Sequence, residues 1–189
     1  MVELDESVEH KNQSLPRLVV LLHWLLASSI FFLFASSWWM LSLPLPSAEF
    51  TYRELPFQLH KNIGITLFAA VITMAAMRVR ALLRQANSSS AWLPRLAVWD
   101  QLLLYMLLMV CCLSGYISSS YSGWTTTLWW LVDIPSMTAE NDDLNILFSE
   151  VHLWSCWALL GLLLLHVGAA IYHGMGNDGA IEKMMRLRK

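Results

Sequence analysis

Residues 150–173, EVHLWSCWALLGLLLLHVGAAIYH, decide the fold of this chain. They are apolar along nearly their whole length, which predicts an α-helix that crosses the ~30 Å hydrocarbon core of a bilayer. His152 and His166 lie within the stretch, fourteen residues apart. On a helix, that step gives ~21 Å of rise and brings both imidazoles to nearly the same face. Ionisable side chains inside a membrane helix are costly, so these two histidines indicate function.

The composition of the whole chain is that of a membrane protein. Of its 189 residues, 57% are hydrophobic and only 14% are charged, which is far from the soluble average. The net charge is -2 and the basic residues occur in short clusters, so we expect no nucleic-acid partner. No cleavable signal precedes the first apolar run, and we expect that run to be retained as an anchor.

Four apolar segments of spanning length follow one another in the sequence. They predict an all-α fold, an integral membrane bundle of four transmembrane helices within residues 18–173. The expected helices are at about 18–43, 59–80, 96–118 and 150–173. A polar N-terminal segment covers residues 1–17, the longest loop covers 119–149, and a basic tail covers 174–189.

Lys and Arg are distributed unevenly over the ends of these helices. They occur in the N-terminal segment, between the second and third helices and in the tail, whereas residues 116–151 contain none and are acidic. The positive-inside rule therefore places both termini in the cytoplasm and the loop 119–149 on the outer face. The tryptophans of that loop predict a short interfacial helix or an aromatic belt that closes the bundle.

The histidines sort into two pairs by depth on this topology. His23 and His166 lie about six residues inside the cytoplasmic ends of their helices, whereas His60 and His152 begin theirs at the outer side. Each pair could hold one planar ligand between two facing helices. Two imidazoles with no nearby carboxylate or thiolate favour haem over zinc, which takes four ligands. The alternative is that each histidine only hydrogen-bonds a neighbouring helix.

Further candidates lie beside these pairs. Gly64 follows His60 by one turn, and it provides either room for a flat macrocycle or close helix packing. His173 follows His166 by seven residues and is a candidate contact for a haem propionate or a quinone carbonyl, or else faces solvent. The cysteines lack CxxC spacing and are expected to be small buried hydrophobes. They are Cys111, Cys112 and Cys156.

These motifs resemble the bacterial cytochrome b561 family of small inner-membrane dihaem cytochromes. The resemblance is carried by LLHWLL around His23, LHKNIGI around His60, YMLLMVCCLSGYISSS at 105–120, VDIPSM at 132–137, the stretch 150–173 and the tail NDGAIEKMMRLRK. It covers essentially the whole chain beyond the N-terminal segment. It implies two b-type haems in the bacterial inner membrane, with the iron ligand pairs His23/His166 and His60/His152.

The resemblance also implies electron exchange with the membrane quinone pool, with ubiquinone as the acceptor. At least one branch of the family takes electrons from superoxide at the outer face. The expected activity is therefore that of an oxidoreductase that moves electrons across the membrane from an outer-face donor, with superoxide a candidate, to quinone. The acidic outer loop does not favour steering of an anion, and it suits a cationic or protein donor.

Three positions depart from the family pattern. Gln101 stands where many members have a histidine, Met74 where many have an arginine, and His173 where many have paired histidines.

The expected partners are membrane lipid, quinone and an outer-face donor. Two other functions stay open. One is a haem-containing membrane anchor that passes electrons for a partner redox protein, and the other is a non-redox metal or haem transporter.

Overall fold

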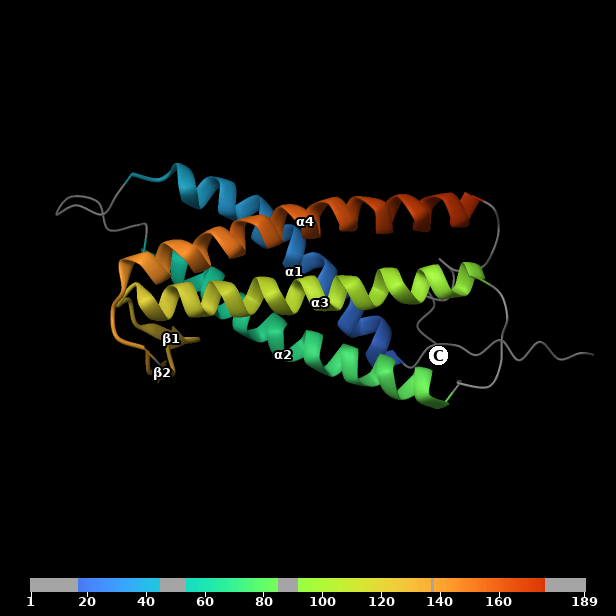
Figure 1. The fold of residues 1–189 in the computed structure, drawn as a ribbon, viewed down its shortest axis with the longest axis horizontal. Coiled ribbons are helices and arrows are strands. Elements are labelled where there is room, and N and C mark those ends of the chain that lie inside the picture. The colour runs from blue at the N-terminus through green and yellow to red at the C-terminus, as the bar shows by residue number, and fades with distance from the viewer. Residues whose placement is uncertain (1–16, 45–53, 85–91, 137, 176–189) are drawn as a thin grey trace, which may run out of the picture.

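Four long helices make up most of the chain (Figure 1). The structure is a computed structural model, and it describes residues 17–44, 54–84, 92–136 and 138–175. The helices are α1 (Arg17–Ser42), α2 (Glu54–Arg84), α3 (Trp92–Tyr121) and α4 (Asp142–Met175), and two short strands, β1 (Thr126–Leu128) and β2 (Val132–Ile134), lie between α3 and α4. All four helices are long and apolar enough to cross a membrane. The predicted all-α bundle of four spanning helices is confirmed.

The helices run alternately up and down, so α1 begins at the end of the bundle where α4 finishes (Figure 1). The β-hairpin lies at the opposite end. An even number of crossings leaves both ends of the described chain on one side. Which side faces the cytoplasm stays a prediction. Most of the polar N-terminal segment and of the basic tail lies outside the described residues.

The fourth helix is longer than its apolar stretch. It begins at Asp142, so eight residues of the expected outer loop are helical. The Asn141 side chain accepts a hydrogen bond from the Leu144 backbone N–H at 3.0 Å, which is an N-cap. Asp142 and Asp143 occupy the first turn, where negative charge stabilises a helix. Local capping therefore extends α4 beyond the segment that hydropathy predicts.

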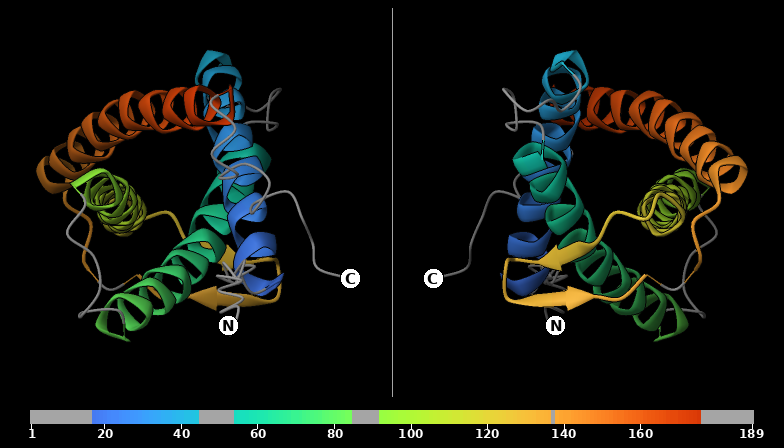
Figure 2. Two further views of the ribbon diagram at one scale, coloured as in Figure 1. Left: turned by 90° about the vertical axis from the view of Figure 1, so that its right-hand side faces the viewer. Right: turned by 90° about the vertical axis from the view of Figure 1, so that its left-hand side faces the viewer.

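The core lies mainly between the first three helices. α1 packs on α2, α2 on α3, and α3 on α4. α4 has no comparable contact with α1 or α2 within the described residues, and it buries only Ser155 and Leu159. Viewed end-on, α3 lies beside the first part of α4, α4 runs across the view toward the side of α1, and α1 and α2 cross (Figure 2). The histidines of α4 therefore face helices with which α4 makes little direct contact.

The outer loop forms a β-hairpin, and the expected short interfacial helix is wrong. β1 and β2 pair antiparallel, with Thr126 opposite Ile134. Trp129 and Trp130 form the turn at φ 47° and 58°, a left-handed conformation that is uncommon for bulky residues. α2 holds this turn in place. Asn62 Oδ1 accepts from the Trp129 backbone N–H at 3.0 Å, and Thr66 Oγ1 accepts from the Trp129 indole at 3.1 Å.

Candidate functional site

The four histidines singled out in the sequence lie in two cross-helix pairs. His23 of α1 lies opposite His166 of α4, with 6.5 Å between the ring centroids. His60 of α2 lies opposite His152 of α4, with 6.3 Å between the centroids. α4 thus contributes one imidazole to each pair. Their role as ligands stays a prediction. The ring separations show whether one metal ion would fit between the two imidazoles of each pair.

Both separations fit two axial ligands of one metal ion. An imidazole nitrogen binds a metal at about 2 Å, and the ring centroid lies about 1 Å further out, so the centroids of two opposed ligands are about 6 Å apart. Space is also present beside the pairs. A Cβ on Gly64 or Gly161 would meet nothing within 4 Å. Gly64 therefore leaves room next to the His60 turn, and its alternative reading as a close helix contact is not supported.

The α3 backbone orients His152. The Cys111 carbonyl oxygen lies 2.8 Å from His152 Nδ1. Since a carbonyl only accepts, Nδ1 carries the proton and Nε2 keeps its lone pair. Gly115 lies one turn further along α3, and a Cβ there would come within 3.0 Å of the His152 ring. A glycine at this position therefore lets the imidazole seat against α3.

A carboxylate on α3 orients His166. Asp100 Oδ2 lies 2.7 Å from His166 Nδ1, and both side chains are partly buried. The expectation that the imidazoles have no nearby carboxylate is therefore wrong. The signal was present in the sequence, because Asp100 is an ionisable residue inside an apolar spanning segment. Its partner, 66 residues away, could not be read from any local pattern.

The other two histidines have weaker neighbours. Ser37 Oγ lies 3.4 Å from His60 Nδ1 and donates to the Leu33 carbonyl at 2.6 Å. The hydroxyl proton is thus used, and the oxygen is left to accept from the imidazole. The His23 ring lies edge-on to Trp24, with 5.5 Å between centroids.

Two cysteines lie beside His152, which the sequence did not predict. The sulfurs of Cys111 and Cys156 are 3.1 Å apart, and with His152 they place three potential metal-binding atoms within 4.8 Å of one another. Cys111 is buried as expected, whereas Cys112 and Cys156 are only half-buried. Zinc takes four ligands, and this cluster supplies three of them from the part of the chain that the structure describes.

The remaining candidates lie toward the end of the bundle where α2 and α4 finish, which is the predicted cytoplasmic end. His173 is exposed in the last turn of α4, next to the Tyr172 ring. Arg78 on α2 holds its Nε buried with no hydrogen-bond partner among the described residues. A buried guanidinium nitrogen of this kind usually has a partner, and an acidic group of a ligand would supply one. Gln101, which replaces the family histidine, donates to the Tyr105 hydroxyl at 3.3 Å.

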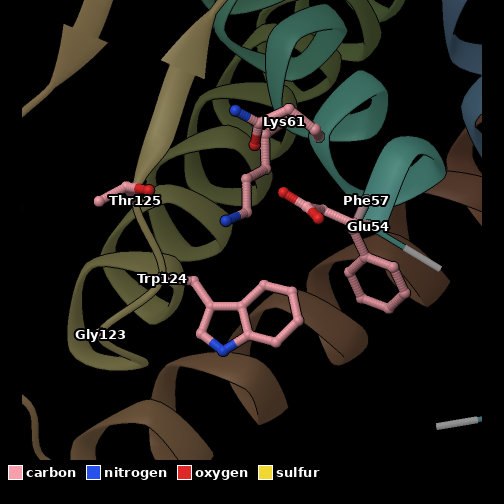
Figure 3. A pocket seen from close by; sticks show the side chains of 7 residues that line it. Glu54, Phe57, Lys61, Gly123, Trp124 and Thr125 are labelled. Atoms are coloured by element: carbon pink, nitrogen blue, oxygen red, sulfur yellow. The ribbon is translucent and has the colours of Figure 1, made fainter. Parts of the chain in front are cut away.

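A cavity of about 350 Å³ opens at the hairpin end of the bundle, the predicted outer end, between the start of α2 and the loop that leads into β1 (Figure 3). Lys61, the neighbour of His60 in the sequence, reaches into it from α2, as does Glu54. The indole of Trp124 forms part of its wall. The lining residues are Glu54, Phe57, Gln58, Lys61, Gly123, Trp124 and Thr125. This volume is at the lower end of the range for small-molecule sites.

Comparison with known proteins identifies the family of the chain. The family model for prokaryotic cytochrome b561 matches residues 14–186. Cytochrome b561 homolog 2 of Escherichia coli (strain K12) is 28% identical over 165 residues, which are 86% of this chain and 86% of that relative. The family match spans all four helices and both histidine pairs. The chain therefore belongs to the prokaryotic cytochrome b561 family, membrane proteins that use b-type haem for transmembrane electron transfer.

Proposed function

We propose that the chain carries electrons across the bacterial inner membrane through two b-type haems, from an outer-face donor to a membrane quinone, with ubiquinone the expected acceptor. The observation that supports this most is the opposition of His23 to His166 and of His60 to His152, with centroids 6.5 Å and 6.3 Å apart. Haem iron, when bound, supplies one-electron redox chemistry. The protein supplies the ligands, the orientation and the surrounding charge.

Each histidine pair would provide both axial ligands of one site. No coordination position is then left for oxygen or substrate, so the site suits electron transfer. α3 contributes no ligand, but it fixes the two imidazoles of α4 through the Cys111 carbonyl and the Asp100 carboxylate. With Nδ1 occupied in each ring, Nε2 is the nitrogen that would bind a metal, although Cys156 Sγ lies 3.7 Å from Nε2 of His152.

The inner end suits acidic and carbonyl groups of ligands. The Arg78 Nε is buried on α2 near that end without a partner among the described residues, and we assign the guanidinium to a haem propionate or a quinone carbonyl. His173 lies in the last turn of α4 and is proposed for the same kind of contact. Both termini would face the cytoplasm, as the distribution of Lys and Arg predicts.

The outer cavity is proposed as the place where the donor approaches. Lys61 puts a cationic group there, directly after the proposed ligand His60, on a face that is otherwise acidic. A local positive charge raises the encounter rate of an anion even where the wider surface does not. Superoxide is one candidate donor, and a small anionic reductant fits the volume of about 350 Å³ as well.

An anchor for a partner redox protein is the second candidate function. The hairpin exposes Trp130, Leu131 and Val132 at the outer end, with Leu131 84% exposed. Apolar side chains at the tip of a loop favour contact with another protein or with the membrane interface. In that case the partner would deliver electrons, and the histidine pairs would still hold the haems that carry them. The family match favours either function over a non-redox transporter.

Replacement of single histidines tests the ligand assignment. We expect His152→Ala or His60→Ala to lower the haem content from two to one per chain, with loss of the outer haem. His23→Ala or His166→Ala should remove the inner haem instead. His10→Ala, a histidine of the N-terminal segment outside both pairs, is the control and should keep two. Haem is quantified optically in the purified protein, and loss of both haems from every single variant would contradict two independent sites.

Replacement of both cysteines tests whether sulfur belongs to the ligand set. The double variant Cys111→Ser/Cys156→Ser should keep two haems per chain, because Cys111 acts through its backbone carbonyl, which serine retains. Its optical spectrum should match that of the parent. One haem per chain in the parent, together with zinc that elemental analysis finds in the parent but not in the double variant, would show instead that Cys111, His152 and Cys156 hold a metal ion.

Neutralisation of Lys61 tests the proposed donor approach. We expect Lys61→Gln to slow reduction of the protein by an anionic one-electron donor by about tenfold at low ionic strength, with haem content unchanged. Glu54→Gln, which removes a negative charge from the same cavity, should speed it. Both effects should shrink as salt is added. Stopped-flow absorbance measures the rates, and equal rates in all three proteins would remove this cavity from the donor path.

A further inference from the structure

Asp100 lies in the membrane-crossing part of α3, eight residues after the helix begins. A carboxylate at this depth is energetically costly, so its retention indicates a purpose. The structure gives Asp100 one partner within the described chain, His166 Nδ1 at 2.7 Å. The two side chains are 27% and 35% exposed respectively, so the contact is partly shielded from its surroundings.

The contact between Asp100 and His166 is short enough for a charge-assisted hydrogen bond, which is stronger than one between neutral groups. An ionised carboxylate only accepts, so the proton lies on Nδ1 and Nε2 is left with its lone pair. A carboxylate in this position holds the ring in one orientation and makes Nε2 a more basic ligand. Asp100 thereby acts on whatever Nε2 binds without touching it.

No carboxylate contacts the outer pair in the described part of the chain. His152 donates to the neutral Cys111 carbonyl at 2.8 Å and has the thiols of Cys111 and Cys156 at 3.7 Å, and His60 lies 3.4 Å from the neutral Ser37 hydroxyl. Asp100 thus gives the inner pair a carboxylate contact that the outer pair lacks. Negative charge stabilises the more positive, oxidised state of a neighbouring metal.

We propose that Asp100 is a positioning residue that, through His166, sets the potential of the inner haem below the value that a neutral partner would give. An inner site of lower potential is a stronger reductant, which suits delivery of electrons to an acceptor near the inner end. The proposal rests on the proposed function insofar as His166 is a haem ligand. It goes further, since it makes the two sites unequal and names the residue responsible.

Asp100→Asn tests the proposal in the full-length purified protein. The amide has almost the same shape and its oxygen can still accept from Nδ1, so only the charge is removed. We expect two haems per chain, with the oxidised-to-reduced equilibrium of the inner haem shifted about tenfold toward the reduced form. For a one-electron couple this is ~59 mV. The outer haem should keep its potential and is the internal control.

Redox titration followed by optical absorbance gives the potentials. A second titration in the His152→Ala background isolates the inner haem, so that each shift is assigned to one site. Electron paramagnetic resonance of the oxidised inner haem should also change, since ligand basicity alters its axial field. Asp100→Glu keeps the charge and should restore the potential. Gln101→Ala, the next residue on α3, should leave it unchanged.

The outcomes separate this proposal from the proposed function. If Asp100→Asn loses the inner haem, the carboxylate is needed to hold His166, and a parent-like potential in Asp100→Glu then supports the proposal. An inner potential that is the same in the parent and in Asp100→Asn would overturn it, as would equal shifts of both haems. If the parent holds no haem that His166→Ala removes, the ligand assignment itself is wrong.

Discussion

An imidazole inside a membrane needs a partner for each ring nitrogen, and this constraint organises the bundle. A polar group left unpaired in hydrocarbon costs several kcal/mol. For the two histidines of α4, α3 supplies one partner each, the Cys111 carbonyl at 2.8 Å and the Asp100 carboxylate at 2.7 Å. Both contacts use Nδ1. In the proposed function the Nε2 atoms would bind haem iron together with the opposed histidines of α1 and α2, in place of the contact of 3.7 Å between Cys156 Sγ and His152 Nε2.

This arrangement explains why α4 packs on α3 and so little on α1 or α2. A helix that buries only Ser155 and Leu159 has little apolar packing to hold it against the other side of the bundle. The open space beside Gly64 and Gly161 also indicates weak packing there, because spanning helices associate mainly through close packing and polar contacts. Two bound macrocycles would join α4 to α1 and α2 where side chains do not. The two ends of the bundle also differ in charge, with Asp100 beside the His23/His166 pair and Lys61 directly after His60 of the other pair.

Much of the fold could be predicted from the sequence because its signals are local. Each of the four apolar runs is one continuous segment, and the fourteen-residue step between His152 and His166 lies within the fourth of them. The contacts of Asp100 and Cys111 could not be predicted, because their partners lie 66 and 41 residues away and follow from how α3 and α4 pack. The hairpin was missed for a related reason. Trp129 and Trp130 adopt a turn conformation that their own propensities disfavour, and Asn62 and Thr66 of α2 stabilise it.

The haem content of the detergent-purified chain, taken with its reduced-minus-oxidised optical spectrum, decides whether the histidine pairs bind haem. We expect two b-type haems per chain, both low-spin in the oxidised and the reduced state, because each iron would have two histidine ligands. A content of one haem or none would contradict it. The opposed histidine pairs would then serve helix packing, or another metal would occupy the cluster around His152.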